Sequence, residues 1–344
     1  MILKISTKNK VLEILESNLR QPVSGEQIAG QLGISRAAVN KAIAELRKDG
    51  IEITAKTRSG YVLEQSPDNI YAQDIAAALG LPACNVIVLN TIDSTNNEAK
   101  RMLNQSTAMN FPAIIIANEQ TAGRGRHNRT FVSPKASSVY LSTIIKPDLP
   151  MDKMLLVTIA AAVAIVNAIE EQMSSDPDFY AEMVHPKIKW VNDIYVGSRK
   201  VCGILTEAIT DVETMSIDKV VVGIGINIGI DIASWPEELR DIVGSIDLPQ
   251  GERSVFVGRV LRHLLACIDM IAQDEKKLMD AYRAYSCVIG EPVRFVKQGM
   301  NYEGLAETIE YDGSLRVRIM SIDGVQHDDY LVEHLSYGEI SIQI

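Results

Sequence analysis

A short cationic segment in the middle of the chain is the first place where the residue types suggest chemistry. Residues 119–129, EQTAGRGRHNR, include a stretch of seven positions that holds three arginines and two glycines. Glycine allows a backbone to approach a ligand closely, and arginine binds pairs of oxygen atoms through two parallel hydrogen bonds. The segment therefore predicts a loop that binds phosphate or another polyanion, with a solvated basic turn as the alternative.

Three other polar segments interrupt or border apolar runs. Residues 93–96, DSTN, begin a predicted helix, where helix capping alone would explain Ser94 or Thr95. Lys189 stands in the apolar run IKWV, so its ammonium either pairs with a carboxylate or serves a ligand, because an unpaired buried charge is costly. GIGIN at 223–227 ends another apolar run, without the glycine spacing of a dinucleotide-binding fingerprint.

Several common kinds of site are missing from the sequence. The dipeptide Gly-Lys never occurs, which excludes a Walker A phosphate loop. The four cysteines, at 84, 202, 267 and 287, form no Cys-x-x-Cys pair, so we expect reduced thiols and no metal-ligating cluster. The first ten residues lack the apolar core of an export signal, and we expect a cytoplasmic protein that does not enter a membrane.

The elements that must position these residues follow a mixed pattern. Strand patterns lie at 86–91, 113–118, 138–145, 188–196, 200–209 and 219–228, and helix patterns at 94–106, 152–172 and 254–284. Strands without regularly alternating helices favour an α+β fold over a doubly wound sheet. Residues 152–172 are apolar on nearly every side and predict a core helix rather than a membrane span.

The first 65 residues have the order of a winged helix-turn-helix. Ser24 and Gln27 have the spacing of a capping box before a short helix that ends at Gly33, and Ser35 caps the next helix. A hairpin-like stretch follows and would be the wing, while a protein-interaction module is the alternative. The helical patterns lie at 9–19, 27–32 and 36–48, and the wing at 51–63.

The helix predicted at 36–48 is expected to face DNA. Its candidates for the buried side are Ala37, Val39, Ile43 and Leu46, and its candidates for DNA contact are Ser35, Arg36, Asn40 and Lys41. Residues 1–65 carry ten Lys and Arg against seven Asp and Glu, a formal charge of +3. Residues 66–344 carry 24 against 37, or −13, so a basic head precedes an acidic body.

Taken in order, the motifs DSTN, EQTAGRGRHNR, KWVND, RKVCGILTE and GIGIN resemble those of the biotin–protein ligase family (biotin–[acetyl-CoA-carboxylase] ligases). With its winged helix, the chain resembles the bifunctional form that also represses biotin synthesis. A length of 344 residues suits two or three domains. The resemblance implies a winged-helix DNA-binding domain at 1–65, a linker at 66–83, a mixed-sheet catalytic domain at 84–287 and a C-terminal SH3-like β-barrel at 288–344.

The resemblance implies a reaction in two steps that needs no enzyme nucleophile. The carboxylate of biotin attacks the α-phosphate of MgATP, which releases pyrophosphate and leaves biotinyl-5′-AMP. A specific lysine of a biotin carboxyl carrier protein then attacks the mixed anhydride, and AMP leaves. The implied ligands are biotin, ATP and Mg²⁺. The implied partners are the carrier protein, operator DNA and a second copy of the chain when biotinyl-AMP is bound.

The resemblance also implies roles for individual residues. The biotin pocket would be lined by Ser94, Thr95, Asn96, Gln120, Arg124, Gly125, Arg126 and Lys189. Of these, Lys189, Arg124 and Arg126 would be catalytic, because they would stabilise charge on the carboxylate and phosphate. Asn227 and Trp235 would lie beside the adenylate. No residue is assigned to a metal.

The chain departs from the family pattern at three positions, with Asn128 in place of Gly, Phe131 in place of Trp and Val191 in place of Pro. Asn tolerates positive φ and Phe preserves aromatic packing, so we expect activity to survive these changes. The rival function is a biotin-sensing transcription factor without ligase activity. Among enzymes, the alternative is a lipoate–protein ligase, which shares a related fold. Intact cationic residues in GRGR, followed by KW-x-ND, favour biotin ligation.

Overall fold

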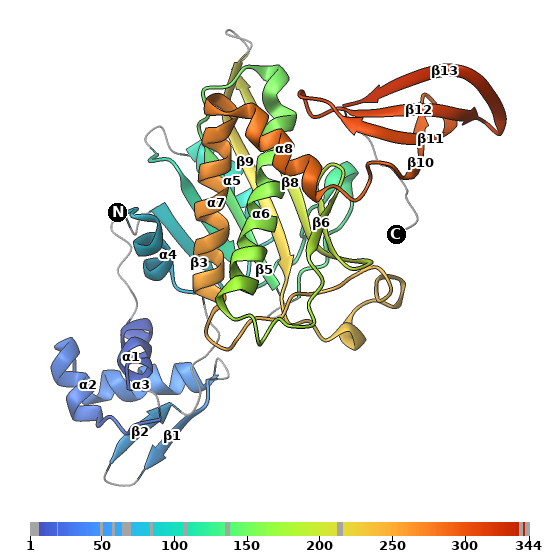
Figure 1. Cartoon of the computed structure of the whole chain (residues 1–344). Helices are drawn as coiled ribbons and strands as arrows, with labels where there is room; N and C mark the ends of the chain where they lie inside the picture. The colour runs from blue at the N-terminus through green and yellow to red at the C-terminus, as the bar shows by residue number, and fades with distance from the viewer. Residues whose placement is uncertain are drawn as a thin grey trace. The chain divides into compact units, whose positions relative to one another are not determined.

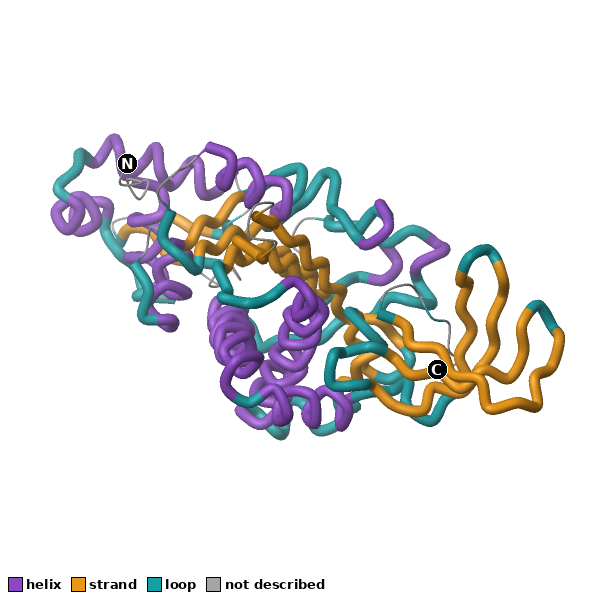
Figure 2. Tube along the Cα trace, turned by 90° about the horizontal axis from the view of Figure 1, so that it is seen from above, coloured by secondary structure: helices purple, strands orange, loops and turns teal. Residues whose placement is uncertain are grey.

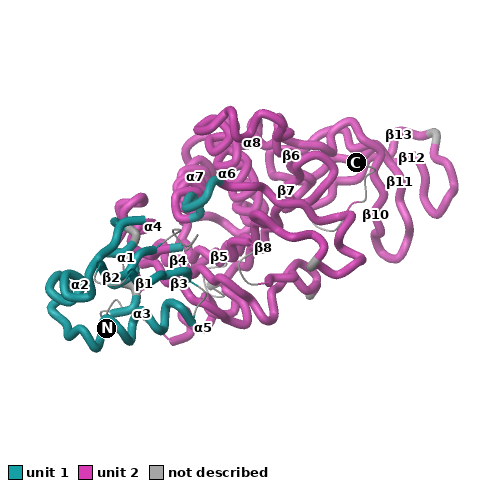
Figure 3. The backbone as a smooth tube through the Cα atoms, turned by 90° about the horizontal axis from the view of Figure 1, so that it is seen from below, with its two compact units in different colours: residues 1–70, 249–253 teal, residues 71–248, 254–344 magenta. Residues whose placement is uncertain are grey.

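A computed structural model describes residues 7–18, 20–48, 51–56, 59–63, 70–82, 85–105, 109–134, 138–211, 216–336 and 340, which form two units (Figure 3). One unit comprises residues 1–70 and 249–253, and the other comprises 71–248 and 254–344. Within the predicted linker 66–83, residues 66–69 and 83 lie outside the described residues, as does Cys84. The three predicted boundaries between these segments stay predictions, because the second unit contains both the central and the C-terminal regions.

The first unit has the predicted order of a winged helix-turn-helix. Its elements are α1 (Thr7–Glu16), α2 (Gly25–Leu32), α3 (Arg36–Lys48) and the antiparallel hairpin of β1 (Ile53–Lys56) and β2 (Gly60–Leu63). Val39, Ile43 and Leu46 of α3 are buried, as predicted. Ala37 is exposed, which corrects its predicted burial, because a position two residues before Val39 lies on the opposite side of the helix.

The capping box that the sequence predicts is present at α2. The Ser24 hydroxyl accepts the Gln27 N–H (3.1 Å), and the Gln27 side chain accepts the Ser24 N–H (2.9 Å). Gly33 ends the helix in the left-handed conformation with φ of 62°. Both signals are local in sequence, so the boundaries of α2 follow directly from residue type.

A seven-stranded mixed sheet forms the core of the second unit. Its order is β3 (Val86–Leu89), β4 (Ala113–Ala117), β5 (Ser138–Ile145), β9 (Ser216–Asn227), β8 (Arg199–Asp211), β7 (Asp193–Val196) and β6 (Pro186–Lys189). Only β3 and β4 pair in parallel, and the other neighbours are antiparallel. The α+β class that the sequence predicts is confirmed.

Helices cover both faces of this sheet. They are α4 (Ala72–Leu79), α5 (Thr95–Gln105), α6 (Met154–Ser175), α7 (Arg253–Gln273) and α8 (Glu275–Tyr285), with α6 and α7 side by side in Figures 1 and 2. Thr206 of β8 meets Thr158 of α6, whereas its neighbours Leu205 and Glu207 meet Asn96 of α5. Because strand residues alternate between faces, α5 and α6 lie on opposite sides.

Helix α6 is long and apolar enough to cross a membrane by length and composition, but 72% of its most apolar stretch is buried inside the protein. It is therefore the core helix that the sequence predicts.

Two predicted elements are corrected by the structure. The strand expected at 188–196 is the hairpin of β6 and β7, and the helix expected at 254–284 is split at Asp274, whose carboxylate accepts the Lys277 N–H (3.1 Å) and caps α8.

A four-stranded antiparallel sheet follows, where the sequence predicts an SH3-like barrel. Its strands are β10 (Pro292–Lys297), β11 (Met300–Ile309), β12 (Leu315–Ile322) and β13 (Val325–Leu335). The indole N–H of Trp190 donates to the Gly313 carbonyl (3.0 Å), and Arg283 donates to the Ile309 carbonyl (2.6 Å). A Cβ added at Gly313 would lie 2.6 Å from Ile159 of α6. The sheet therefore contacts α6, α8 and Trp190, which directly follows β6.

Candidate functional site

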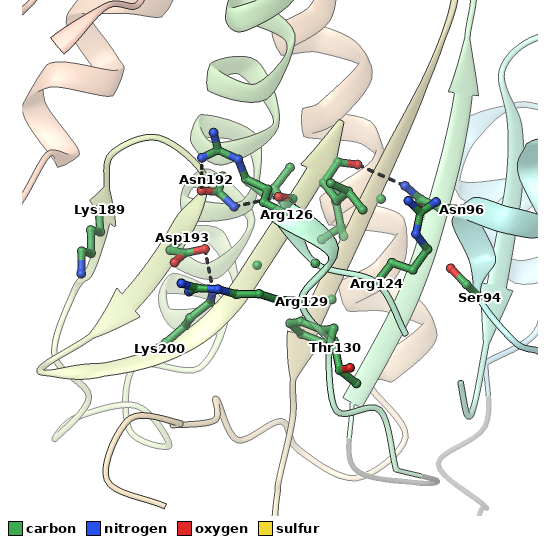
Figure 4. Close-up of a pocket in the computed structure, with 18 of the residues that line it drawn as sticks. Ser94, Asn96, Arg124, Arg126, Arg129, Thr130, Lys189, Asn192, Asp193 and Lys200 are labelled. Atoms are coloured by element: carbon green, nitrogen blue, oxygen red, sulfur yellow. Dashed lines mark hydrogen bonds and ion pairs between the residues drawn. The ribbon is translucent and has the colours of Figure 1, made fainter. Parts of the chain in front are cut away.

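The residues predicted to do chemistry surround one cavity of about 440 Å³ on the α5 side of the seven-stranded sheet (Figure 4). All eight residues predicted to line a biotin pocket contribute to its wall: Ser94, Thr95, Asn96, Gln120, Arg124, Gly125, Arg126 and Lys189. They come from α5, the segment after β4 and the end of β6. The wall also includes Arg129 of the predicted cationic loop and Phe131, together with residues that had no predicted role, among them Asn192, Asp193, Lys200, Ile242 and Ile340.

One end of the cavity is lined by buried, uncharged polar groups. Ser94, Thr95 and Asn96 are each at most 4% exposed. The Thr95 N–H, at the start of α5, donates to the side-chain oxygen of Gln120 (2.8 Å), and the Gln120 amide nitrogen donates to Ser133 (3.0 Å). Gln120 therefore accepts a hydrogen bond from a backbone N–H in the first turn of α5. Helix capping predicted this role for Ser94 or Thr95. These contacts hold Gln120 in place at the cavity wall.

A carboxylate lies directly behind this polar end. Glu207 accepts a hydrogen bond from the Asn96 amide nitrogen (2.8 Å) and another from the Lys100 ammonium (2.6 Å). The Arg124 guanidinium lies 3.3 Å from the same carboxylate and also donates to Asn97 (3.2 Å). Glu207 closes the motif RKVCGILTE, and its place inside an otherwise apolar strand is the sequence signal that could have identified it.

The cationic segment folds back on itself. The Gly125 N–H donates to the Arg129 carbonyl (2.8 Å), and the Phe131 N–H donates to the Gly123 carbonyl (2.9 Å). Between them, the 3₁₀ turn Arg126–Asn128 carries Arg126, whose guanidinium donates to Asn192 (3.0 Å). Figure 4 shows Arg124 on the side of Asn96 and Arg126 on the side of Asn192. The two guanidinium groups are therefore held by partners on different sides of the cavity.

Glycines of the GIGIN segment make room for two of the cavity's side chains. A Cβ at Gly223 would lie 2.1 Å from the Asn96 oxygen, and a Cβ at Gly225 would lie 2.5 Å from the Phe131 ring. The ring of Phe131 also packs edge to face against Tyr140. Phe131 thus keeps an aromatic contact with the sheet, as expected for a replacement of Trp.

The far end of the cavity carries Lys189 at the end of β6. Asp193 pairs with Lys200 (2.7 Å), and within the described part of the chain no carboxylate is paired with Lys189. The Lys189 ammonium lies over the ring of Tyr195, 5.7 Å from its centroid. Burial, and then the nearby Asp193, raise the pKa of Tyr195 to about 12, so this phenol is neutral at pH 7. The ligand interpretation of Lys189 is the one that these contacts favour.

The charged side chains of the cavity wall are mostly cationic. Among the described residues of its wall, five are cationic (Arg124, Arg126, Arg129, Lys189 and Lys200) and one, Asp193, is anionic. Figure 4 places Arg126, Lys189, Asp193 and Lys200 together, away from Ser94 and Asn96. A ligand with an uncharged polar head and an anionic tail fits this distribution, because arginine and lysine bind phosphate and carboxylate oxygens well.

Asn227 and Trp235 do not line the cavity. The Asn227 side chain donates to the Gly244 carbonyl (3.0 Å) and accepts from Ser138 (3.3 Å), so it fastens the segment after β9. Trp235, in that segment, is 5% exposed, and its indole N–H has no hydrogen-bond partner among the described residues. The structure therefore does not bring these two residues to the groups predicted to bind biotin.

The four residues predicted to contact DNA lie on the exposed side of α3 or at its start. The Ser35 hydroxyl caps α3 by accepting the Ala38 N–H (3.2 Å). The Asn40 oxygen accepts the hydroxyl of Tyr61 in the wing (2.8 Å), which leaves its amide nitrogen to donate. Arg36 and Lys41 are exposed cations on the same helix. The winged unit thus holds Asn40 in one orientation.

The described residues contain no group of three His, Cys, Asp or Glu side chains that would hold a metal ion. A magnesium ion that arrives on a nucleotide needs no such cluster, because it keeps several waters and takes most other ligands from phosphates. The cationic cavity is therefore compatible with a magnesium–nucleotide substrate.

Known families match both units of the chain. The Biotin/lipoate A/B protein ligase family matches residues 88–227, and an HTH domain matches residues 7–62. The chain is 32% identical over 322 residues to the bifunctional ligase/repressor BirA of Bacillus subtilis, covering 91% of this chain and 94% of that protein. It is 28% identical over 326 residues to BirA of Escherichia coli, covering 93% and 92%.

The fold has a solved counterpart. A biotin protein ligase from Aquifex aeolicus in complex with biotin and ATP superimposes with a TM-score of 0.57. That structure is 23% identical in sequence, and the match covers 75% of this chain and 98% of that chain. The likeness shows that the two chains share a fold.

Proposed function

Because the chain belongs to the biotin protein ligase family, in its bifunctional ligase/repressor form, we propose that the cavity is where biotin is activated by ATP. The chain is an ATP-dependent biotin–protein ligase and a biotin-responsive transcriptional repressor. The observation that carries the proposal is a single cavity that joins an uncharged hydrogen-bonding end to five cationic side chains. Biotin has the matching shape, with an uncharged ureido ring at one end and a carboxylate at the other.

The reaction proceeds in two steps. A biotin carboxylate oxygen attacks the α-phosphorus of ATP, a carboxyl–phosphate bond forms, and pyrophosphate leaves with the electron pair of the broken bond. The amine of an acceptor lysine then attacks the activated carbonyl, loses a proton to solvent and displaces AMP. Both steps develop charge on oxygen atoms, so fixed cations and positioning supply the catalysis.

The roles of individual residues follow from their places along the cavity. Thr95, Asn96 and Gln120 hold the ureido ring through hydrogen bonds. Arg124 and Arg126 bind the carboxylate and phosphate, and Lys189 stabilises the charge that develops where these two groups join. Mg²⁺ would be bound with ATP as part of the substrate, and it would supply neutralisation of the charge on pyrophosphate.

Adenine must lie beyond the cationic end. The segment that follows β9 carries Trp235 and contributes Ile242 to the cavity wall. A buried indole N–H without a partner is costly, so movement of this segment over bound nucleotide would give Trp235 a partner or a stacking surface. Asn227 anchors the start of the segment and supports the adenylate without touching it.

Ligase activity is tested by mixing the protein with biotin, MgATP and an apo biotin carboxyl carrier domain and weighing the carrier by intact mass spectrometry. A single biotin adduct that requires ATP and does not form with lipoate in place of biotin is expected. If the folded protein binds biotin but gives no adduct, the biotin-sensing transcription factor without ligase activity is the better description.

The winged unit supports the repressor function. Arg36, Asn40 and Lys41 enter the major groove of operator DNA, with Ser35 at the start of the same helix. Formation of biotinyl-AMP in the cavity promotes a homodimer, and two winged helices then read a palindromic site. The ligase acts on the carrier protein and the repressor acts on operator DNA, both in the cytoplasm.

A further inference from the structure

The segment after β9 (residues 228–246) pairs with the start of β8 at a residue that lines the cavity. The Lys200 N–H donates to the Ile242 carbonyl (2.8 Å), and the Gly244 N–H donates to the Lys200 carbonyl (2.9 Å). Lys200 and Val243 thus pair as neighbours in a parallel sheet do. Lys200 and Ile242 both contribute to the cavity wall. The position of the segment therefore sets the position of one part of that wall.

Arg199, directly before this pairing, holds the same segment without lining the cavity. Its guanidinium donates to the Arg240 carbonyl (3.0 Å) and makes a longer contact with the Val243 carbonyl (3.5 Å). These two carbonyl groups lie on either side of Ile242 in the sequence. One side chain therefore fixes the backbone on both sides of the residue that reaches the cavity, as the planar, multiple N–H groups of arginine allow.

A second arginine extends this arrangement to Trp235. The Arg240 guanidinium donates to the Trp235 carbonyl (2.9 Å), while the Arg240 carbonyl accepts from Arg199. Both hydrogen bonds have a charged donor, and such bonds are stronger than those between neutral groups. Both are made to backbone carbonyls, so they fix the path of the chain from β8 to the buried indole.

Gly244 shows how closely the segment packs against Arg199. A Cβ added at Gly244 would lie 2.7 Å from the Cβ of Arg199, which is closer than two carbon atoms can approach without a shift. The Cβ of Arg199 is attached to the backbone, so it cannot swing away as the end of a side chain would. A side chain at position 244 would therefore push the segment and β8 apart.

We propose that Arg199 is a positioning residue for ATP, because it anchors the segment after β9 at Ile242. The part of the segment that carries Trp235 then closes over the nucleotide from a fixed point. The inference rests on the proposed function, in which this segment lies beside adenine. Arg199 does not touch the substrate. The uncharged polar end of the cavity is built by α5 and Gln120, so a change at Arg199 affects ATP and leaves biotin binding as it is.

The test is steady-state ligation of the carrier domain by the full-length protein, with ATP and biotin varied in turn. Arg199→Ala should raise the Michaelis constant for ATP about tenfold, as for one lost hydrogen bond to a charged donor. The Michaelis constant for biotin should stay within about twofold of the wild-type value. Arg199→Lys should restore part of the loss, because an ammonium keeps the charge but lacks the planar fork. A general loss of structure would not separate the two substrates in this way.

Gly244→Ala is an independent test, because it displaces the segment and leaves the Arg199 guanidinium in place. It should raise the constant for ATP selectively as well, which keeps the inference testable if Arg199→Ala does not fold. Arg47→Ala is the matched control. It removes a guanidinium bond to a backbone carbonyl, that of Ile53 (2.8 Å), in the winged unit, and should change neither constant.

The two proposals fail in different ways. An unchanged constant for ATP in a folded Arg199→Ala or Gly244→Ala variant would overturn the inference, and so would an equal rise for both substrates. A wild type that gives no ATP-dependent biotin adduct would instead overturn the proposed function.

Discussion

Lys189 is a single side chain whose surroundings leave it available to a ligand, since the neighbouring carboxylate of Asp193 is paired with Lys200. Replacing Lys189 by alanine should lower the rate of adenylate formation about a hundredfold or more, as expected for loss of a group that stabilises charge in the transition state. The measurement is biotin-dependent pyrophosphate release. Lys187→Ala, at an exposed lysine of the same strand, is the control and should keep the wild-type rate. Wild-type turnover by Lys189→Ala would remove the role assigned to it.

Arg126 holds the cationic segment to the far end of the cavity through Asn192 (3.0 Å). Replacing Arg126 by glycine should release biotinyl-AMP into solution, because both a cation and the contact that closes the segment are lost. Lysines on bystander proteins should then become labelled. The assay is streptavidin detection of a mixture of the carrier domain and serum albumin. Labelling restricted to the carrier lysine would contradict closure by this segment.

Gly223 lies where a methyl group would collide with the Asn96 oxygen, at 2.1 Å. Gly223→Ala should raise the Michaelis constant for biotin about tenfold or more, because Asn96 is held by several hydrogen bonds and yields only by breaking them. Steady-state ligation at varied biotin measures this. Gly30→Ala is the matched control, since no atom lies within 4 Å of its added Cβ, and it should leave ligation unchanged while stabilising α2 slightly.

At the scale of elements, the wing and α3 are joined by one hydrogen bond from Tyr61 to Asn40 (2.8 Å). Tyr61→Phe should weaken operator binding by about fivefold, because the Asn40 side chain regains rotational freedom before it can read a base. The salt dependence of binding should stay the same, since no phosphate contact is lost. Lys41→Ala, by contrast, should reduce the slope of log affinity against log salt by about one. Fluorescence anisotropy on an operator selected from a random library measures both.

Elements whose signals are local could be predicted from the sequence. The capping box at Ser24, the left-handed Gly33 and the alternating or apolar runs of β4 and β5 each depend on residues a few positions apart. The predicted strand at 188–196 failed because its apolar run continues through the turn between β6 and β7. The predicted long helix at 254–284 failed because Asp274 acts as a cap, which residue type alone does not distinguish from an exposed aspartate.

The candidate site was predictable in its residue types and not in its contacts. The eight residues assigned to a biotin pocket by resemblance do line one cavity. Glu207 was missed because its partner Asn96 is 111 positions away, and such pairing depends on how strands order in the sheet. Trp235 was placed near the ligand by resemblance, whereas the structure keeps it outside the cavity wall.

At the scale of the whole molecule, one chain carries a cavity in one unit and a helix-turn-helix domain in the other. We expect biotin with MgATP to tighten operator binding, because the proposed adenylate-stabilised homodimer would present two linked helices with a higher effective concentration. Operator binding should also fall steeply with salt. Analytical ultracentrifugation and gel shifts with and without ligand test this. A shift that responds to neither ligand nor salt would contradict the repressor mechanism.

The contact between Trp190 and the Gly313 turn restricts which C-terminal segments could replace residues 288–344 of this protein. Because the turn fits against Ile159 and accepts from an indole next to Lys189, the last four strands share a surface with the neighbourhood of the reacting groups. An ancestral or engineered exchange of residues 288–344 between relatives would succeed only if the donor segment brought a glycine turn of matching shape. The fit of this one turn therefore limits which C-terminal segments the chain can accept without disturbing the neighbourhood of Lys189.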